Sequence, residues 1–228
     1  MGYARDERLG LCSTLTEVGP DAPTLCAGWT ARDLAAHLVL REHRPDAGMG
    51  ILGGPLARYT EHVQHRMAQQ VPYPKLVETV RNGPPRLSVF GIPGMDERAN
   101  LVEYFVHHED VRRGADGWQP REIGAGLAEQ LWERLGMARF ILRKAPVGIE
   151  LARSDANGAD GADRQASAGR KDALRHRITV RNGTPVVTVV GHPGELVLWA
   201  LGRTSAAQVR LDGAEKAVEA LNSAHWRL

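Results

Sequence analysis

The sequence predicts an α+β protein in which a helical bundle over residues 1–145 precedes a small α/β domain over residues 146–228. Two observations carry this prediction. Apolar residues recur at helical spacing as far as residue 144, and after Pro146 they alternate as they do in strands. A chain of 228 residues is long enough for one large domain or two small ones.

The first part of the chain contains four segments with helical periodicity. They are expected over residues 3–18, 34–42, 56–70 and 75–81. The second segment also has a recognisable start. Thr30 can accept a hydrogen bond from the backbone N–H of Asp33, and the Asp33 carboxylate can reach back, as in a capping box.

A fifth helix is expected over residues 96–113, and it carries a polar stripe. Glu103 and His107 are four residues apart and therefore share a face, with Asn100 and Asp110 on the same side. Burying a carboxylate and an imidazole costs several kcal/mol unless the groups are paired or bound. The stripe is therefore a candidate half-site for a metal, and Asp110 is expected to orient a ligand rather than to be one.

A third ligand is predicted at His37, on the apolar side of the helix over 34–42. Spacing alone does not select it, because Glu61–His65 has the same four-residue spacing in a run that we interpret as a solvated face. From the residues alone, metal ligation and a hydrogen-bonded core histidine are both open for His37 and His107. His108 is expected to point away from His107, as a surface or packing residue.

The second part of the chain alternates helices and strands. A long helix is expected over residues 120–144. Strands are expected over residues 147–152, 177–180, 186–190 and 208–211, and helices over 193–201 and 214–221. Asn182-Gly183 is a strong two-residue turn signal, which predicts a hairpin between the second and third strands.

Composition limits the class of partner. The formal net charge is only +2, and basic residues are mixed with acidic ones, so neither nucleic acid nor a membrane is expected as a partner. Two cysteines, Cys12 and Cys26, indicate a reducing compartment and two small core residues rather than a disulfide framework. The charged start of the chain has no apolar run after it, which predicts a cytoplasmic protein without a signal peptide.

Three segments resemble a known family. The segment from Cys26 to Leu38, CAGWTARDLAAHL, is similar to the first signature of the mycothiol-dependent maleylpyruvate isomerase family, within the DinB/YfiT-like superfamily of helical metalloproteins. Glu103-x-x-x-His107-x-x-Asp110 resembles the second signature. The segment from Gly191 to Arg203 is similar to part of the family's C-terminal domain.

The resemblance implies a DinB-like four-helix bundle followed by a sterol-carrier-like α/β domain. It also implies a divalent metal held by His37, Glu103 and His107, with zinc as the first choice and nickel, cobalt, iron or manganese as alternatives. Three protein ligands leave an open position, which is typical of catalytic rather than structural sites. The Ala-, Gly- and Arg-rich composition would suit an actinobacterial source, where mycothiol occurs.

The activity implied by the resemblance is that of a metal- and mycothiol-dependent transferase or isomerase acting on a small electrophilic substrate. Arg203 is the candidate catalytic residue, expected to position a substrate carboxylate, and Arg41 is the candidate contact to the thiol cofactor. An ordinary surface role is equally open for both arginines. The alternative function is a non-catalytic metal- or small-molecule-binding protein, and the chain is expected to be a monomer or homodimer.

Overall fold

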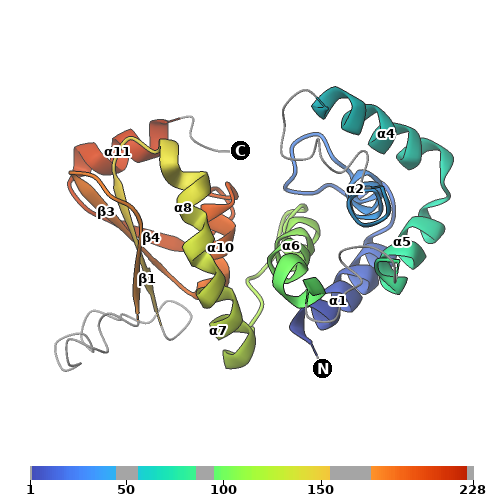
Figure 1. The fold of residues 1–228 in the computed structure, drawn as a ribbon, viewed down its shortest axis with the longest axis horizontal. Coiled ribbons are helices and arrows are strands. Elements are labelled where there is room, and N and C mark those ends of the chain that lie inside the picture. The colour runs from blue at the N-terminus through green and yellow to red at the C-terminus, as the bar shows by residue number, and fades with distance from the viewer. Residues whose placement is uncertain (1, 45–55, 86–94, 155–175, 225–228) are drawn as a thin grey trace. The chain divides into compact units, whose positions relative to one another are not determined.

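The computed structural model describes residues 2–44, 56–85, 95–154 and 176–224. The chain forms two compact units, Met1–Pro120 and Arg121–Leu228 (Figure 1). The first unit is helical, and the second combines helices with a four-stranded sheet. The predicted α+β class is therefore confirmed. Among the residues described, no helix is both long and apolar enough to cross a membrane.

The helices expected in the first unit are confirmed, with ends that differ by a few residues. They are α1 (Tyr3–Val18), α2 (Ala31–His43), α4 (Ala57–Gln70), α5 (Tyr73–Asn82) and α6 (Met95–Arg112). The capping box at the start of α2 is also present. Thr30 accepts from the backbone N–H of Asp33, and the backbone N–H of Thr30 donates to the Asp33 carboxylate at 3.0 Å.

The core of the first unit lies between α1, α2 and α6. The most extensive contact is between α1 and α6, while α5 contacts both α1 and α2. Leu11 and Leu15 of α1, Leu34 and Leu38 of α2 and Leu101 of α6 are fully buried there. Because α2 and α6 each contribute one side to this core, polar residues on their buried faces are carried into the interior.

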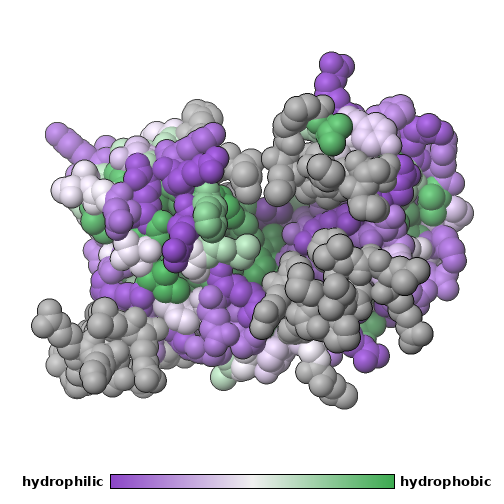
Figure 2. Space-filling model, in the orientation of Figure 1, coloured by the Kyte–Doolittle hydropathy of each residue, from purple (hydrophilic) through white to green (hydrophobic). Residues whose placement is uncertain are grey.

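Helix α4 covers α2 and is more polar than a typical core helix. Glu61 and His65 are exposed, as expected for a solvated face, and the outer side of α4 and α5 is largely hydrophilic in the view of Figure 2. The buried side of α4 consists of Thr60, Gln64 and Ala68. A polar side chain, Gln64, is therefore turned toward the inside of the helical unit.

The second unit places its helices against a mixed sheet (Figure 1). Its helical elements are α7 (Ala125–Arg134), the short 3-10 turns η2 (Leu135–Met137) and η3 (Leu142–Lys144), α8 (Ala138–Ile141), α10 (Pro193–Ala200) and α11 (Glu215–Ser223). The strands are β1 (Gly148–Arg153), β2 (Arg177–Arg181), β3 (Val186–Gly191) and β4 (Val209–Asp212). Their order in the sheet is β2-β1-β3-β4.

The predicted hairpin between the second and third strands is wrong. Strand β1 lies between β2 and β3, antiparallel to β2 and parallel to β3. The Asn182-Gly183 turn still reverses the chain, but it carries it past β1. Gly148 and Gly183 meet so closely there that a Cβ on Gly148 would lie 2.4 Å from the carbonyl oxygen of Gly183. Neither Asn182 nor Gly183 has the positive φ that the predicted two-residue turn requires. The turn signal therefore did not predict the observed connection, and the strand pairing is set by the rest of the sheet.

The long helix expected over residues 120–144 is interrupted, and it belongs to the second unit. Gly136 lies in η2, between α7 and α8, where a glycine weakens a continuous helix. Helix α7 contacts α10, and the turns and α8 contact β2. The boundary between the two units therefore falls after Pro120 rather than at the expected residue 145. Residues 121–144 belong to the second unit because they pack on α10 and β2.

Candidate metal site

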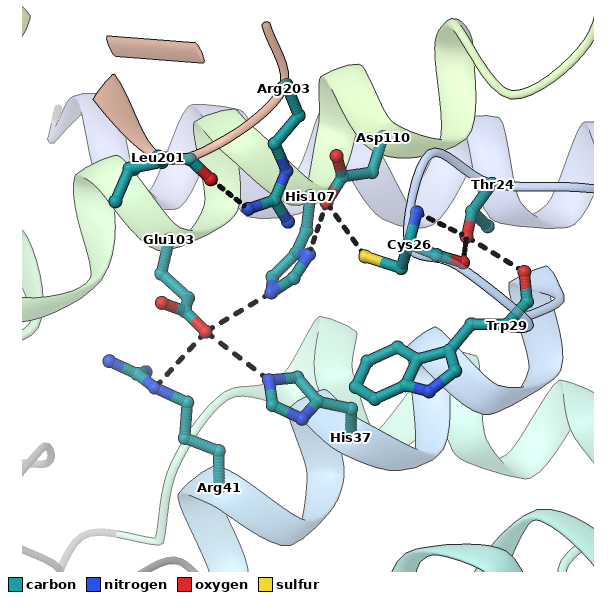
Figure 3. A network of polar contacts seen from close by, with 10 residues as sticks. All are labelled: Thr24, Cys26, Trp29, His37, Arg41, Glu103, His107, Asp110, Leu201 and Arg203. Atoms are coloured by element: carbon teal, nitrogen blue, oxygen red, sulfur yellow. Dashed lines mark hydrogen bonds and ion pairs between the residues drawn. The ribbon is translucent and has the colours of Figure 1, made fainter. Parts of the chain in front are cut away.

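Helices α2 and α6 bring the three predicted ligands together. His37 comes from α2, and Glu103 and His107 come from successive turns of α6 (Figure 3). The distance from Glu103 Oε1 to His107 Nε2 is 3.3 Å, and that to His37 Nε2 is 3.5 Å. These three donor atoms lie within 4.8 Å of one another, so the donors predicted from sequence converge.

The spacing of the donors fits a tetrahedral ion. With Zn–N and Zn–O bonds of about 2.0–2.1 Å, two ligand atoms at a tetrahedral angle lie roughly 3.3 Å apart. Charge-assisted N–H···O bonds are shorter, about 2.7–2.9 Å. Two neutral imidazoles and one carboxylate also suit zinc and other first-row divalent ions. The residues present therefore fit a divalent metal.

Burial and charge set the protonation of the three groups. Burial lowers the pKa of His37, which leaves its imidazole neutral and able to bind an ion. Burial alone would raise the pKa of Glu103, but hydrogen bonds from His107 and His37 hold it well below its usual value. Burial alone would lower the pKa of His107, but hydrogen bonds with Asp110 and Glu103 raise it well above the usual range. An ion at His107 Nε2 would replace a proton there.

A second layer of side chains holds the two histidines. His107 Nδ1 lies 2.8 Å from Asp110 Oδ2, and Asp110 is fully buried. This contact leaves Nε2 directed at Glu103, as in the carboxylate–histidine pairs that support metal ligands. The buried side chain of Gln64 from α4 lies beside His37 and acts against the lowering of its pKa. The role of Asp110 was expected from sequence, but that of Gln64 was not, since it lies within a run of polar residues.

The two arginines singled out from sequence lie in different units. Arg41 Nε is 3.4 Å from Glu103 Oε1, and its guanidinium also donates to Asn100. Arg41 therefore contacts a predicted ligand directly, and its role toward a thiol stays a prediction. In the second unit, Arg203 donates to the backbone carbonyl of Leu201 at 2.7 Å. Its role toward a substrate also stays a prediction.

Sequence reasoning missed the part played by the loop before α2. Cys26 was expected to be a core residue, yet it is only half-buried and its thiol donates to Asp110 Oδ2 at 3.2 Å. The ring of Trp29 lies 5.0 Å from that of His37. Figure 3 shows both residues beside the candidate ligands. The available signal was that Cys26 and Trp29 belong to the same family-like segment as His37.

Comparison with known proteins gave one match, which lies within the first unit. Residues 2–86 match the family model described as the mycothiol maleylpyruvate isomerase N-terminal domain. A search of the curated proteins and a search of the solved structures each gave no significant match. The match includes the first of the two signatures, with His37. This match confirms the resemblance to the mycothiol maleylpyruvate isomerase family over residues 2–86, while the second signature and the segment from Gly191 to Arg203 lie outside it.

Proposed function

We propose that this protein is a divalent-metal- and thiol-dependent transferase or isomerase that acts on a small electrophilic substrate. The observation that supports this most directly is the convergence of His37 Nε2, His107 Nε2 and Glu103 Oε1 at separations of 3.3 and 3.5 Å. Three ligands leave a position for an exogenous group. The family match of the first unit supports mycothiol as the thiol. The DinB-like four-helix bundle, the sterol-carrier-like domain and a cytoplasmic location are parts of the same proposal.

The residues divide the work as follows in this proposal. His37 and His107 supply neutral nitrogens, and Glu103 supplies one negative charge that partly balances the ion. Arg41 stands against the same carboxylate oxygen and limits how that oxygen can turn. When bound, a divalent ion would lower the pKa of a thiol at the open position and so favour the thiolate, which is the nucleophile.

Substrate placement is assigned to the arginines. Arg41 is largely buried beside the candidate ligands, but 15% of its side chain stays exposed, so it can offer a charge to a group entering from solvent. Arg203 is proposed to position a carboxylate of the substrate, and its bond to Leu201 restrains the guanidinium. The sequence also predicts that segments 44–55 and 82–95 line the mouth of the pocket, and these segments lie largely outside the described residues.

The test is metal content of the purified protein beside matched histidine variants. We expect about one equivalent of zinc or a similar ion in the native protein, and its loss in His37→Ala and in His107→Ala. His65→Ala is the control, because His65 has a carboxylate four residues earlier but lies exposed on α4. A native protein without metal after reconstitution, or equal loss in all three variants, would contradict the proposal.

A thiol titration separates the enzyme from the non-catalytic alternative. If the protein is a thiol-dependent enzyme, a low-molecular-weight thiol added to the cobalt-substituted protein should bind the metal and create a sulfur-to-metal charge-transfer band. A protein that only senses or stores metal should bind the ion tightly and show no change with thiol. The same titration with His107→Ala is the blank, since that variant should hold no ion.

A further inference from the structure

The loop over residues 24–30, between α1 and α2, is docked on the end of α6. The backbone N–H of Leu25 donates to the backbone carbonyl of Asp110 at 3.0 Å. Just beyond α6, Gly114 lies so close that a Cβ there would be 2.1 Å from the carbonyl oxygen of Pro23. This close approach requires glycine at 114, and it fixes the start of the loop against the helix that carries Glu103 and His107.

The same loop reaches both histidines. Cys26 contacts Asp110, which holds His107, and Trp29 lies over His37. The loop is braced internally, since Trp29 N donates to Cys26 O at 2.9 Å. Gly28 has a φ of +76°, in the left-handed region that favours glycine, and this turn returns the chain to Trp29. A short, braced loop therefore supports both imidazoles at once (Figure 3).

Asp110 Oδ2 is the point where these contacts meet. It accepts from Cys26 Sγ at 3.2 Å and lies 2.8 Å from His107 Nδ1. Asp110 has no exposed surface, and a buried carboxylate needs hydrogen-bond donors to remain charged and ordered. Loss of the thiol would remove one of the donors that keep this oxygen directed at His107.

The distances indicate hydrogen bonding in this second cluster rather than a second metal. Cys26, His107 and Asp110 could also offer three ligand atoms to an ion. Around a tetrahedral ion, however, the nitrogen and oxygen would lie roughly 3.3 Å apart and the sulfur and oxygen roughly 3.5 Å. The observed separations are 2.8 and 3.2 Å. The cluster is therefore more compact than metal coordination requires, unlike the set formed by His37, Glu103 and His107.

We propose that Cys26 is a positioning residue of the metal site, acting on His107 through Asp110. Its thiol holds the carboxylate so that His107 keeps its proton on Nδ1 and presents Nε2 to the ion. This inference rests on the proposed metal site. Partners of metal ligands typically change metal affinity by roughly 10–100-fold. Because Cys26 acts one step further out than Asp110, we expect the lower end of that range.

The experiment measures metal affinity by competition with a chelator in single and double variants. Cys26→Ala should weaken binding about tenfold, whereas Cys26→Ser, which keeps an O–H donor, should restore most of the affinity. Cys12→Ala is the matched control, because the Cys12 thiol is buried on α1 and donates to Val77 instead. In an Asp110→Ala background, adding Cys26→Ala should have no further effect if the two residues act in series.

Cobalt spectra and thermal unfolding complete the test. Cys26→Ala should shift the ligand-field bands of bound Co²⁺ as His107 reorients, with a melting temperature close to that of Cys12→Ala. Unchanged affinity in Cys26→Ala, in a native protein that binds metal, would overturn this inference and leave the proposed function standing. A sulfur-to-cobalt charge-transfer band in the absence of added thiol, lost in Cys26→Ser, would also overturn it by making Cys26 a ligand. A native protein that binds no metal would overturn both.

Discussion

His107 and His108 are neighbours on α6, and they have opposite surroundings. His107 faces α2, where its Nε2 converges with His37 Nε2 on a single oxygen of Glu103. His108 faces α1, where each ring nitrogen has its own partner. Nδ1 lies 3.2 Å from Glu7 Oε2, and Nε2 lies 3.0 Å from Thr14 Oγ1. Gly10 of α1 leaves the space that the His108 ring occupies.

The difference separates a candidate metal ligand from a core histidine. Both rings are buried, with 7% of each residue exposed, so burial does not distinguish them. Around His108 the polar atoms are distributed so that each is satisfied by one neighbour. Around His107 several groups crowd one carboxylate oxygen at distances longer than ordinary charged hydrogen bonds. We infer that the convergence of several side chains on one carboxylate oxygen distinguishes the candidate metal site. Burial and spacing in sequence do not.

The strongest test of this difference is to neutralise the carboxylate beside each histidine, Glu103 for His107 and Glu7 for His108. Glu103→Gln should reduce metal affinity by more than the roughly 100-fold that loss of a supporting partner costs, because an amide oxygen is a weaker, uncharged ligand. Glu7→Gln should leave metal affinity unchanged, since Glu7 contacts only the other histidine among those compared. Isothermal titration with zinc checks both. Equal losses in the two variants would show that the clusters do not have separate roles.

Removing the second histidine should affect folding rather than metal. His108→Ala leaves the Glu7 carboxylate buried without the ring that faces it, which should lower the free energy of unfolding by about 3 kcal/mol. Urea denaturation of the metal-free protein measures this, with exposed His65→Ala as the control. A loss within about 0.5 kcal/mol, as for ordinary surface substitutions, would mean that His108 is not the structural member of the pair.

The pH dependence of stability should distinguish the metal-free from the metal-bound protein. Burial alone would lower the pKa of His107 from 6.5, but its bonds to Asp110 and Glu103 raise it well above that value. The stabilisation from protonated His107 is therefore complete below pH 6.5 and is lost as the pH rises through the raised pKa, by about 1.4 kcal/mol per pH unit.

Bound metal should remove this alkaline loss, because the ion then occupies Nε2 in place of the proton. Chemical denaturation between about pH 6.5 and 9, with and without a chelator, measures the two slopes. At acid pH the contribution that is lost is that of Glu103. The pKa of Glu103 is held well below 4.5, so its stabilisation is lost only as the pH falls through that lowered pKa. Identical alkaline slopes with and without metal would exclude His107 as the group that exchanges a proton for the ion.

The shared face of the candidate ligands Glu103 and His107 could be predicted because it depends on helix geometry. Four-residue spacing places Glu103 and His107 on one face of α6 whatever surrounds the helix, and the capping box at Thr30 is equally local. Gln64 could not be found this way. The buried face of α4 is Thr60, Gln64 and Ala68, which carries no large apolar residue, so hydrophobic periodicity says nothing about which side faces inward.

Features that depend on contacts between distant parts of the chain could not be predicted either, because local sequence patterns do not determine them. Asn182-Gly183 favours a tight turn locally, but neither residue has the positive φ of such a turn, and β3 pairs with β1, which lies 38 residues earlier in the chain. Apolar residues on α7 indicate a covered face without saying whether helices or a sheet cover it. The contact from Cys26 to Asp110 joins residues separated by 84 positions. These features depend on tertiary contacts, which the patterns in a single sequence indicate only weakly.

The smallest expected effect concerns the supports of the two ligand histidines. The Asp110 carboxylate holds His107, whereas the group beside His37 is the neutral amide of Gln64. An amide polarises an imidazole less than a carboxylate does, so Gln64→Ala should weaken metal binding by about tenfold or less, at the bottom of the usual range for such partners. Gln70→Ala, exposed at the end of the same helix, is the matched control. If Gln64→Ala cost as much affinity as Asp110→Ala, the two histidines would be equivalent ligands, and the unequal charge of their supports would have no consequence for the metal.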